Sequence, residues 1–212
     1  MNRPIRKKLN SESLLLIGIP KKFISCDISD FEVSHDSLQP VKDKITEYID
    51  NIDSMFSSNS GILFSGSNGV GKTMLASIIL KEAYRHRYSC RRTTFVEYLD
   101  SYTRMWNSRS LDEKDLVEQD FYSMYKAVEF LVLEELGKEI DSKVAAPILE
   151  DCLRYREEHG LVTIICTNLP VSAIERKYGA SCFSLLKGNM IPIRIEGEDH
   201  RPVEFSLKKR GK

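Results

Sequence analysis

The sequence lacks several features that would assign it to common classes of protein. No C-x-x-C pair occurs among its five cysteines, Cys26, Cys90, Cys152, Cys166 and Cys182, so neither a zinc site nor a disulfide framework is indicated. The 31 basic and 31 acidic residues give no net charge. That balance does not predict nucleic-acid binding, although it leaves room for a local basic patch.

Long hydrophobic runs are also missing. The apolar run at 14–19 is too short to span a membrane, and Lys21 and Lys22 follow where a signal peptide would carry small residues. We therefore expect no membrane partner and a reduced, cytoplasmic protein.

The most informative segment that is present is a glycine-rich loop. Residues 66–73 read Gly66-Ser67-Asn68-Gly69-Val70-Gly71-Lys72-Thr73, which fits the phosphate-binding pattern G-x-x-x-x-G-K-T. An apolar strand is expected before it at 61–65 and an apolar helix start after it at 74–80. Backbone N–H groups of such a loop surround phosphates, Lys72 would reach the β- and γ-phosphates, and Thr73 would bind Mg²⁺. The sequence therefore predicts a site for a nucleoside triphosphate and Mg²⁺.

Strands and helices are expected to alternate along the chain. Strands are predicted at 61–65, 93–96, 130–133, 161–166 and 191–195, and helices at 41–56, 74–85, 97–126, 142–159 and 171–178. Three of the strands are continuous apolar runs, which is typical of a parallel sheet covered on both faces. We expect an N-terminal extension over 1–40 and one ATP-binding domain over 41–212.

Polar residues follow two of these strands, at the sheet edge where α/β proteins bind ligands. Glu134 and Glu135 end the third strand; the first could hold Mg²⁺ and the second could polarise an attacking water. Asn168 ends the fourth strand, where its amide could contact both the water and the γ-phosphate. The alternatives are that a charged turn ends the third strand and that Asn-Leu-Pro is an ordinary turn.

In combination, these motifs resemble the AAA+ ATPase group that contains the DnaC/DnaI replicative helicase loaders and the IstB transposition helpers. The resemblance covers about residues 40–202 and is carried by 66–73, 131–137, 154–155, 163–169 and 197–201. It implies a P-loop NTPase fold with a five-stranded parallel sheet between helices, in the order 5-1-4-3-2, and little or no C-terminal lid domain.

The resemblance also implies functional roles. Glu135 resembles the catalytic glutamate, Asn168 the first sensor, and Arg201 a second sensor that faces the γ-phosphate. ATP and Mg²⁺ are the implied cofactors, and assembly into open rings or spirals is the implied self-association. In such assemblies a neighbouring subunit contributes an arginine finger.

The chain departs from the family pattern at two places. Glu134 stands where the family usually has aspartate, which could weaken the placement of Mg²⁺. Segment 181–187, where the family's arginine finger lies, contains no arginine. Lys187 and Arg176 are the candidate substitutes, although lysine lacks the planar fork of arginine. A missing finger typically costs about 10³-fold or more in rate, so we expect a slow, partner-stimulated ATPase.

The resulting hypothesis is an ATP-dependent loader of a hexameric replicative helicase that binds single-stranded DNA. Residues 1–40 would contact the helicase. Segment 97–126 contains Tyr98, Tyr102, Arg104, Trp106 and Arg109, which would suit DNA binding, but a helix stripe packed on the domain is at least as good an interpretation. The alternatives are an IstB-like helper acting on duplex DNA, a non-hydrolysing ATP-binding adaptor, and a small-molecule kinase, for which the arginine-rich lid is not found.

Overall fold

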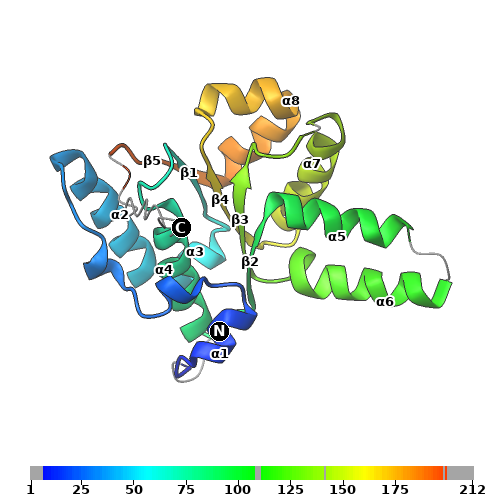
Figure 1. Ribbon diagram of the computed structural model, residues 1–212, viewed down its shortest axis with the longest axis horizontal. Helices are drawn as coiled ribbons and strands as arrows, with labels where there is room; N and C mark the ends of the chain where they lie inside the picture. The colour runs from blue at the N-terminus through cyan, green and yellow to red at the C-terminus, as the bar shows by residue number, and fades with distance from the viewer. Residues whose placement is uncertain (1–6, 108–110, 141, 198, 200–212) are drawn as a thin grey trace, which may run out of the picture.

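The structure is a computed structural model that describes residues 7–107, 111–140, 142–197 and 199 (Figure 1). The strands are β1 (Gly61–Ser65), β2 (Cys90–Thr94), β3 (Phe130–Leu136), β4 (Val162–Thr167) and β5 (Met190–Arg194). The helices are α1 (Ser11–Leu16), α2 (Gln39–Asp50), α3 (Ile52–Ser57), α4 (Lys72–Arg85), α5 (Phe95–Asn107), α6 (Leu111–Phe121), α7 (Ser142–Glu158) and α8 (Val171–Asn189). Short 3₁₀ turns lie at η1 (Lys21–Phe23), η2 (Ile28–Asp30) and η3 (Asp36–Leu38), and a π-helical turn lies at η4 (Tyr122–Lys126).

The five strands form one parallel sheet in the order β2-β3-β4-β1-β5. This is the predicted order 5-1-4-3-2 read from the other edge, and it confirms the expected fold class. Pro192 lies in β5 at the edge of the sheet, where the lack of an N–H group is tolerated. Among the described residues, none after Arg194 belongs to a helix or strand.

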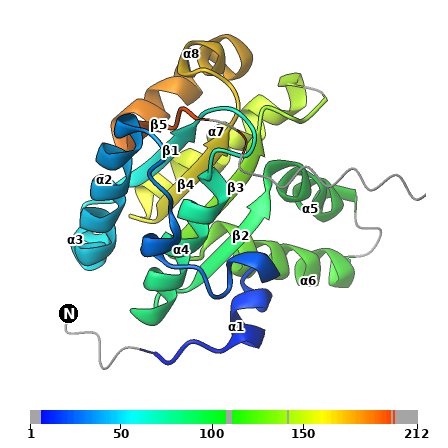
Figure 2. The same ribbon diagram turned by 60° about the vertical axis from the view of Figure 1, so that its left-hand side comes forward.

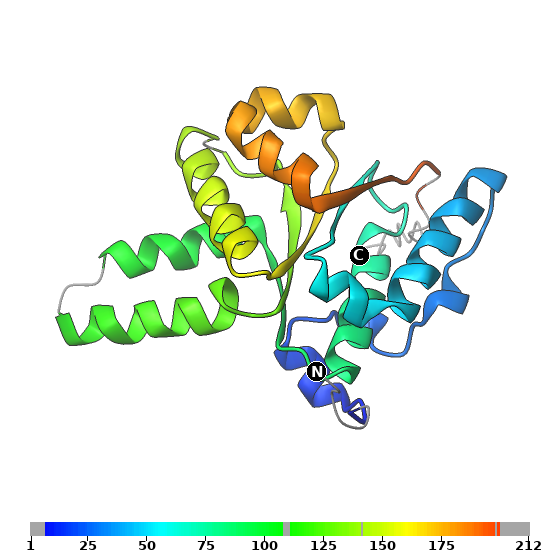
Figure 3. The ribbon, with the colours of Figure 1, turned by 180° about the vertical axis from the view of Figure 1, so that it is seen from behind.

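Helices cover both faces of this sheet (Figures 1 and 3), and a hydrophobic core lies on each face. Side chains alternate between them along each central strand, because successive strand residues point to opposite faces. In β1, Ile62 and Phe64 join the core beneath α2 and α4, whereas Leu63 joins the core beneath α7 and α8. The strands are apolar throughout because both of their faces are buried.

The junction between β2 and α5 differs from the prediction. The second strand ends at Thr94, and Phe95 begins the helix instead of continuing the strand. The Thr94 amide donates to the Glu97 carboxylate (2.9 Å), and the Glu97 amide donates to Thr94 Oγ1 (3.1 Å). This reciprocal capping box satisfies two amides at the helix start, and the motif Thr-x-x-Glu was its signal in the sequence.

The helical stretch predicted at 97–126 is divided into α5, α6 and the π-helical turn η4. Helices α5 and α6 lie side by side and project from the sheet (Figures 1 and 2). Tyr98 is completely buried, Tyr102 packs on Phe121 (5.6 Å between ring centroids), and Trp106 is 62% exposed. The aromatic stripe is thus a core contact at one end and a surface feature at the other. Arg109 lies outside the described residues.

Residues before α2 pack closely on the domain. Leu14, Ile19, Phe31 and Leu38 are buried in the core on the α4 side. Lys81 of α4 donates hydrogen bonds to backbone carbonyls between 23 and 26. The expected extension therefore contributes to the core of the domain, while its partner-binding role stays a prediction. Of the helices that the structure describes, none is long and apolar enough to cross a membrane.

Candidate nucleotide-binding site

The loop between β1 and α4 has a backbone that requires glycine. Gly66 has φ +150°, and a Cβ atom there would lie 2.2 Å from the Ile195 carbonyl oxygen. Gly71 has φ +103° and precedes the first residue of α4. Side chains at either position would force the loop open, since L-residues rarely adopt these conformations. The start of α4 therefore presents its N–H groups and its positive dipole end to the loop, which is the arrangement that binds phosphate.

Lys72 is held over this loop. Its Nζ donates hydrogen bonds to the carbonyl oxygens of Gly66 (2.8 Å) and Ser67 (2.5 Å), and the residue is 9% exposed. A phosphate in the loop would offer the ammonium group stronger, charged acceptors than these carbonyls. The lysine is thus placed to exchange loop contacts for phosphate contacts.

Thr73 and Glu134 come together from different parts of the chain. The Thr73 hydroxyl donates to Glu134 Oε2 (2.9 Å), and Glu134 is only 3% exposed. Hydroxyl and carboxylate oxygens are the ligands that Mg²⁺ prefers alongside nucleotide phosphates. The pair therefore fits a magnesium site. The other carboxylate oxygen, Oε1, lies 3.3 Å from Arg92 Nε, an interaction that the sequence pattern did not indicate.

Glu135 has a different environment from its neighbour. It occupies an irregularity between Leu133 and Leu136 and has φ +61°. This left-handed conformation is unusual for a residue with a side chain, and such strain is often found at functional sites. The carboxylate is half-exposed and accepts a hydrogen bond from Lys138 Nζ (2.6 Å). Glu135 is therefore turned away from the buried position of Glu134 and is accessible to solvent.

Asn168 lies beside the loop. Its Nδ2 donates to Oδ1 of Asn68 (2.8 Å), 100 positions earlier in the sequence. The structure thus brings together the end of β4 and the phosphate-binding loop, as the predicted role of Asn168 requires. The contact with Asn68 was not foreseen. Arg201, the expected second sensor, lies outside the described residues.

Cys166 lies under the same site but is not a reactive thiol. It is 1% exposed. Burial, assisted by the negative charge of Glu134, raises the pKa of the Cys166 thiol well above its ordinary value. A thiol that stays protonated is a poor nucleophile, so the cysteine serves as a small core residue, as its apolar sequence context predicted.

Segment 181–187 lies within α8, which is kinked at Gly179. Both suggested substitutes for the missing arginine, Arg176 and Lys187, are exposed. A further cation lies beside the segment: Arg154 of α7 pairs with Glu150 (2.8 Å) and reaches Ser181 Oγ (3.5 Å). Arg154, Arg176 and Lys187 therefore all lie at the surface of α7 and α8.

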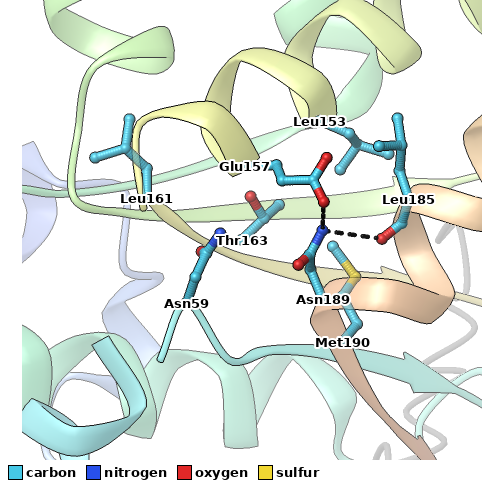
Figure 4. Close-up of a pocket in the computed structure, with 8 residues that line it drawn as sticks. All are labelled: Asn59, Leu153, Glu157, Leu161, Thr163, Leu185, Asn189 and Met190. Carbon is cyan, nitrogen blue, oxygen red and sulfur yellow. Dashed lines mark hydrogen bonds between the residues drawn. The ribbon is translucent and has the colours of Figure 1, made fainter. Parts of the chain in front are cut away.

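Two cavities lie away from the loop. The smaller, about 10 Å³, is bordered by Asn59, Thr163 and Met190 at the amino ends of the strands (Figure 4), and holds one water molecule at most. There, Asn189 Nδ2 donates to Glu157 Oε1 (2.7 Å). The larger, about 370 Å³, lies at the β2 edge beside Arg91 and Arg92. The nucleotide site lies at the carboxyl ends of the strands, so the smaller cavity is at the opposite edge of the sheet.

Several solved structures share this fold. The DnaC helicase loader is 20% identical (TM-score 0.71), with 84% of this chain and 100% of that chain covered. DnaI is also 20% identical (TM-score 0.63), with 87% and 95% covered. The replication initiator DnaA bound to AMPPCP and single-stranded DNA is 16% identical (TM-score 0.67), with 85% and 52% covered. At these identities the likeness shows the fold alone.

Sequence comparison gives the family. No curated protein matches the chain in sequence. The model of the family described as "ATPase family associated with various cellular activities (AAA)" matches residues 62–178, which is more than half of the chain. This range includes the phosphate-binding loop, both strand ends that approach it and the asparagine that contacts it. The chain therefore belongs to the AAA family of ATPases.

Proposed function

We propose that this ATPase is an ATP-dependent loader of a hexameric replicative DNA helicase. It would bind single-stranded DNA and the helicase as an ATP-controlled oligomer during DNA replication. The proposal is supported by the meeting of the ends of β3 and β4 at the phosphate-binding loop, through Thr73–Glu134 and Asn68–Asn168. The loader assignment is supported by the similarity in fold to the DnaC helicase loader along the whole of that chain.

The residues divide the work on ATP as follows. Loop amides 66–73 and Lys72 would bind the phosphates, and Thr73 and Glu134 would hold Mg²⁺, which would supply neutralisation of phosphate charge. Glu135 orients and polarises the attacking water. Its exposed carboxylate can release the hydrogen bond from Lys138 and accept one from that water instead. Asn168, which contacts Asn68 of the loop, positions the γ-phosphate. Arg201 would act as the second sensor.

Hydrolysis is proposed to be slow and stimulated by a partner. Segment 181–187 offers Lys187 but no arginine, and a lysine cannot make the bidentate contact of a guanidinium. A non-hydrolysing ATP-binding adaptor is the second candidate function, because the Glu135 carboxylate is already paired with Lys138. Both candidate functions require ATP binding, but only the loader hydrolyses the bound ATP.

The first experiment measures ATP binding and hydrolysis by the purified chain, with and without single-stranded DNA. Lys72→Ala should abolish binding, and Glu135→Gln should retain binding but lose turnover. Lys44→Ala, at an exposed position of α2, is the matched control and should behave as the wild type. Turnover as fast as that of vigorous AAA+ motors would contradict the slow-ATPase proposal, whereas binding without turnover under all conditions would select the adaptor.

The helicase contact is proposed to lie on the N-terminal extension. In α1, Leu16 is 75% exposed and Leu15 is 40% exposed, beside the fully packed Leu14. Deleting residues 1–40 would remove buried core side chains as well, so loss of binding would be ambiguous. Leu16→Asp changes the exposed face alone and should weaken helicase binding while sparing ATP binding. Glu12→Ala on the same helix is the control, and unchanged helicase affinity in Leu16→Asp would remove α1 from the contact.

An IstB-like action on duplex DNA remains an alternative. Comparing affinity for single-stranded and duplex oligonucleotides of equal length, at one salt concentration, separates it from the loader. Preference for duplex DNA would favour the transposition helper.

A further inference from the structure

The segment that follows α1 lies along the edge strand β2. Arg91 Nη1 donates to the Leu16 carbonyl (2.8 Å), and the Arg92 amide donates to the Ile17 carbonyl (2.7 Å). Gly18 completes the contact with φ +94°, and a Cβ atom there would lie 2.2 Å from the Arg92 carbonyl oxygen. Only glycine permits so close an approach. Residues 16–18 are thus docked on β2 through their backbone carbonyl groups, which accept from the Arg91 side chain and the Arg92 amide. Figure 2 shows the end of α1 beside β2.

Arg92 connects this docked segment to the nucleotide site. Its Nη1 donates to the Gly18 carbonyl (3.1 Å), while its Nε lies 3.3 Å from Glu134 Oε1. Glu134 in turn accepts the hydrogen bond from Thr73 (2.9 Å) at its other oxygen. A continuous line of contacts therefore runs from the extension, through β2 and β3, to the first turn of α4.

The glutamate at position 134 suits this arrangement. Its carboxylate is almost completely buried and is held at both oxygens, by Thr73 on one side and Arg92 on the other. An aspartate would be shorter by one C–C bond, about 1.5 Å, so its carboxylate could not keep both contacts without backbone movement. The departure from the family's usual aspartate is therefore matched by an arginine on the neighbouring strand.

We propose that Arg92 is a positioning residue for the Glu134 carboxylate, and that the docked segment 16–18 sets the position of Arg92. The N-terminal extension thereby controls how the site binds magnesium and nucleotide. This inference rests on the proposed function, because it requires a magnesium–nucleotide complex at the loop. It adds a residue and a route of control that neither the loop motif nor the family fold specifies.

The test follows nucleotide binding rather than turnover. A fluorescent ATP analogue is titrated at fixed protein concentration over a range of MgCl₂ concentrations, with an EDTA sample as the metal-free reference. Arg92→Ala should raise the Mg²⁺ concentration for half-maximal binding by about tenfold, since residues that orient metal ligands typically contribute 10–100-fold to metal affinity. Metal-free binding should stay the same. Lys44→Ala is the control, because Lys44 lies at an exposed position of α2 and contacts neither segment 16–18 nor Glu134.

Further variants distinguish a positioning role of Arg92 from a general loss of structure. In a Glu134→Asp background, Arg92→Ala should cause no additional shift, since the shorter carboxylate has already lost the arginine. Gly18→Ala should reproduce the shift of Arg92→Ala. Gly188→Ala should not, because beyond its chain neighbours and the nearby backbone of α8 no atom lies within 4 Å of the added Cβ. Thermal unfolding of each variant shows whether it is folded.

The outcomes are distinct. Wild-type protein that binds no nucleotide at any Mg²⁺ concentration would contradict the proposed function itself. Wild-type binding with an unchanged or lower Mg²⁺ requirement in folded Arg92→Ala would overturn only the positioning role. Additive effects in the Glu134→Asp background would likewise show that Arg92 acts by another route. A normal Mg²⁺ requirement in folded Gly18→Ala would overturn control by the docked segment.

Discussion

The hydroxyl of Thr73 donates a hydrogen bond to the carboxylate of Glu134 across 2.9 Å, although 61 positions separate the two residues. The contact joins the first turn of α4 to the end of β3. Thr73→Val keeps the shape of the side chain and removes the hydroxyl, so it should weaken Mg²⁺-dependent nucleotide binding by about tenfold or more. Thr73→Ser should retain most of the affinity. Equal losses in both variants, measured by fluorescent-nucleotide titration, would contradict a role for the hydroxyl.

Asn168 should matter for hydrolysis more than for binding. Its amide reaches the loop through Asn68, where it can contact charge that develops at the γ-phosphate. Asn168→Ala should lower kcat by about 10²-fold, the usual cost of losing one oriented donor, with little change in nucleotide Kd. Steady-state turnover and equilibrium binding give the two numbers. Asn189→Ala, at the other end of the sheet, is the matched control. A loss confined to Kd would assign Asn168 to binding.

Arg156 should be essential for stability. It is completely buried, and burial lowers its pKa to about 10, so it remains charged at neutral pH. Its guanidinium donates to Thr163 Oγ1 and to the carbonyls of 126, 128 and 162 at 2.6–3.1 Å. Arg156→Met would leave these buried acceptors unsatisfied and should lower the free energy of unfolding by about 3–5 kcal/mol.

The control for that experiment lies two positions away. Arg154 is on the same helix but is half-exposed and paired with Glu150, so Arg154→Met should cost about 1 kcal/mol or less. Urea unfolding of both variants measures the difference. Similar costs would show that the buried network of Arg156 contributes little.

Glu139 should make stability depend on pH in the acidic range. Burial raises the pKa of its carboxyl group, but hydrogen bonds from Lys177, Tyr178 and the Gly137 amide outweigh burial and lower the pKa below its ordinary value. The fold thus favours the carboxylate. Its stabilisation is fully present above the unfolded value near 4.5 and is lost as pH falls through the lower folded pKa.

Glu139→Gln should therefore be less stable than the wild type at pH 7, and the difference should shrink as pH falls below about 4.5. Urea unfolding at several pH values measures it. Glu47→Gln, at an exposed position of α2, should show no comparable trend. A difference between wild type and Glu139→Gln that is constant from pH 7 to pH 3 would contradict the linkage.

Trp106 offers a direct test of the DNA surface. It is the single tryptophan of the chain and is 62% exposed, with Lys114 Nζ 5.4 Å from its ring centroid. If α5 and α6 grip single-stranded DNA, bases should stack on the indole and quench its fluorescence in a salt-dependent manner. Arg104→Glu combined with Lys114→Glu should weaken this binding, while Lys44→Glu should not. DNA binding without a change in fluorescence would place the DNA site elsewhere.

The local sequence pattern was sufficient to predict much of this architecture. The phosphate-binding loop needs no distant contact, because its glycines and the helix after it create the anion site themselves. The five strands and their parallel arrangement followed from apolar runs that alternate with helical segments, whereas the order of the strands was implied by the family resemblance. Errors fell at junctions such as Thr94, where a capping box ended the strand earlier than the apolar pattern indicated.

The sequence by itself therefore determined the fold class, the loop and the candidate residues at the strand ends, since those depend on spacing along the chain. Only the tertiary structure decided which of these residues meet. Arg92 carries no motif, and Gly18 is an ordinary glycine in the sequence. Both gain their significance from the packing of the N-terminal segment on β2, next to the buried carboxylate of Glu134. Contacts between segments distant in sequence follow from how the two hydrophobic cores close around the sheet, and no local pattern encodes that closure.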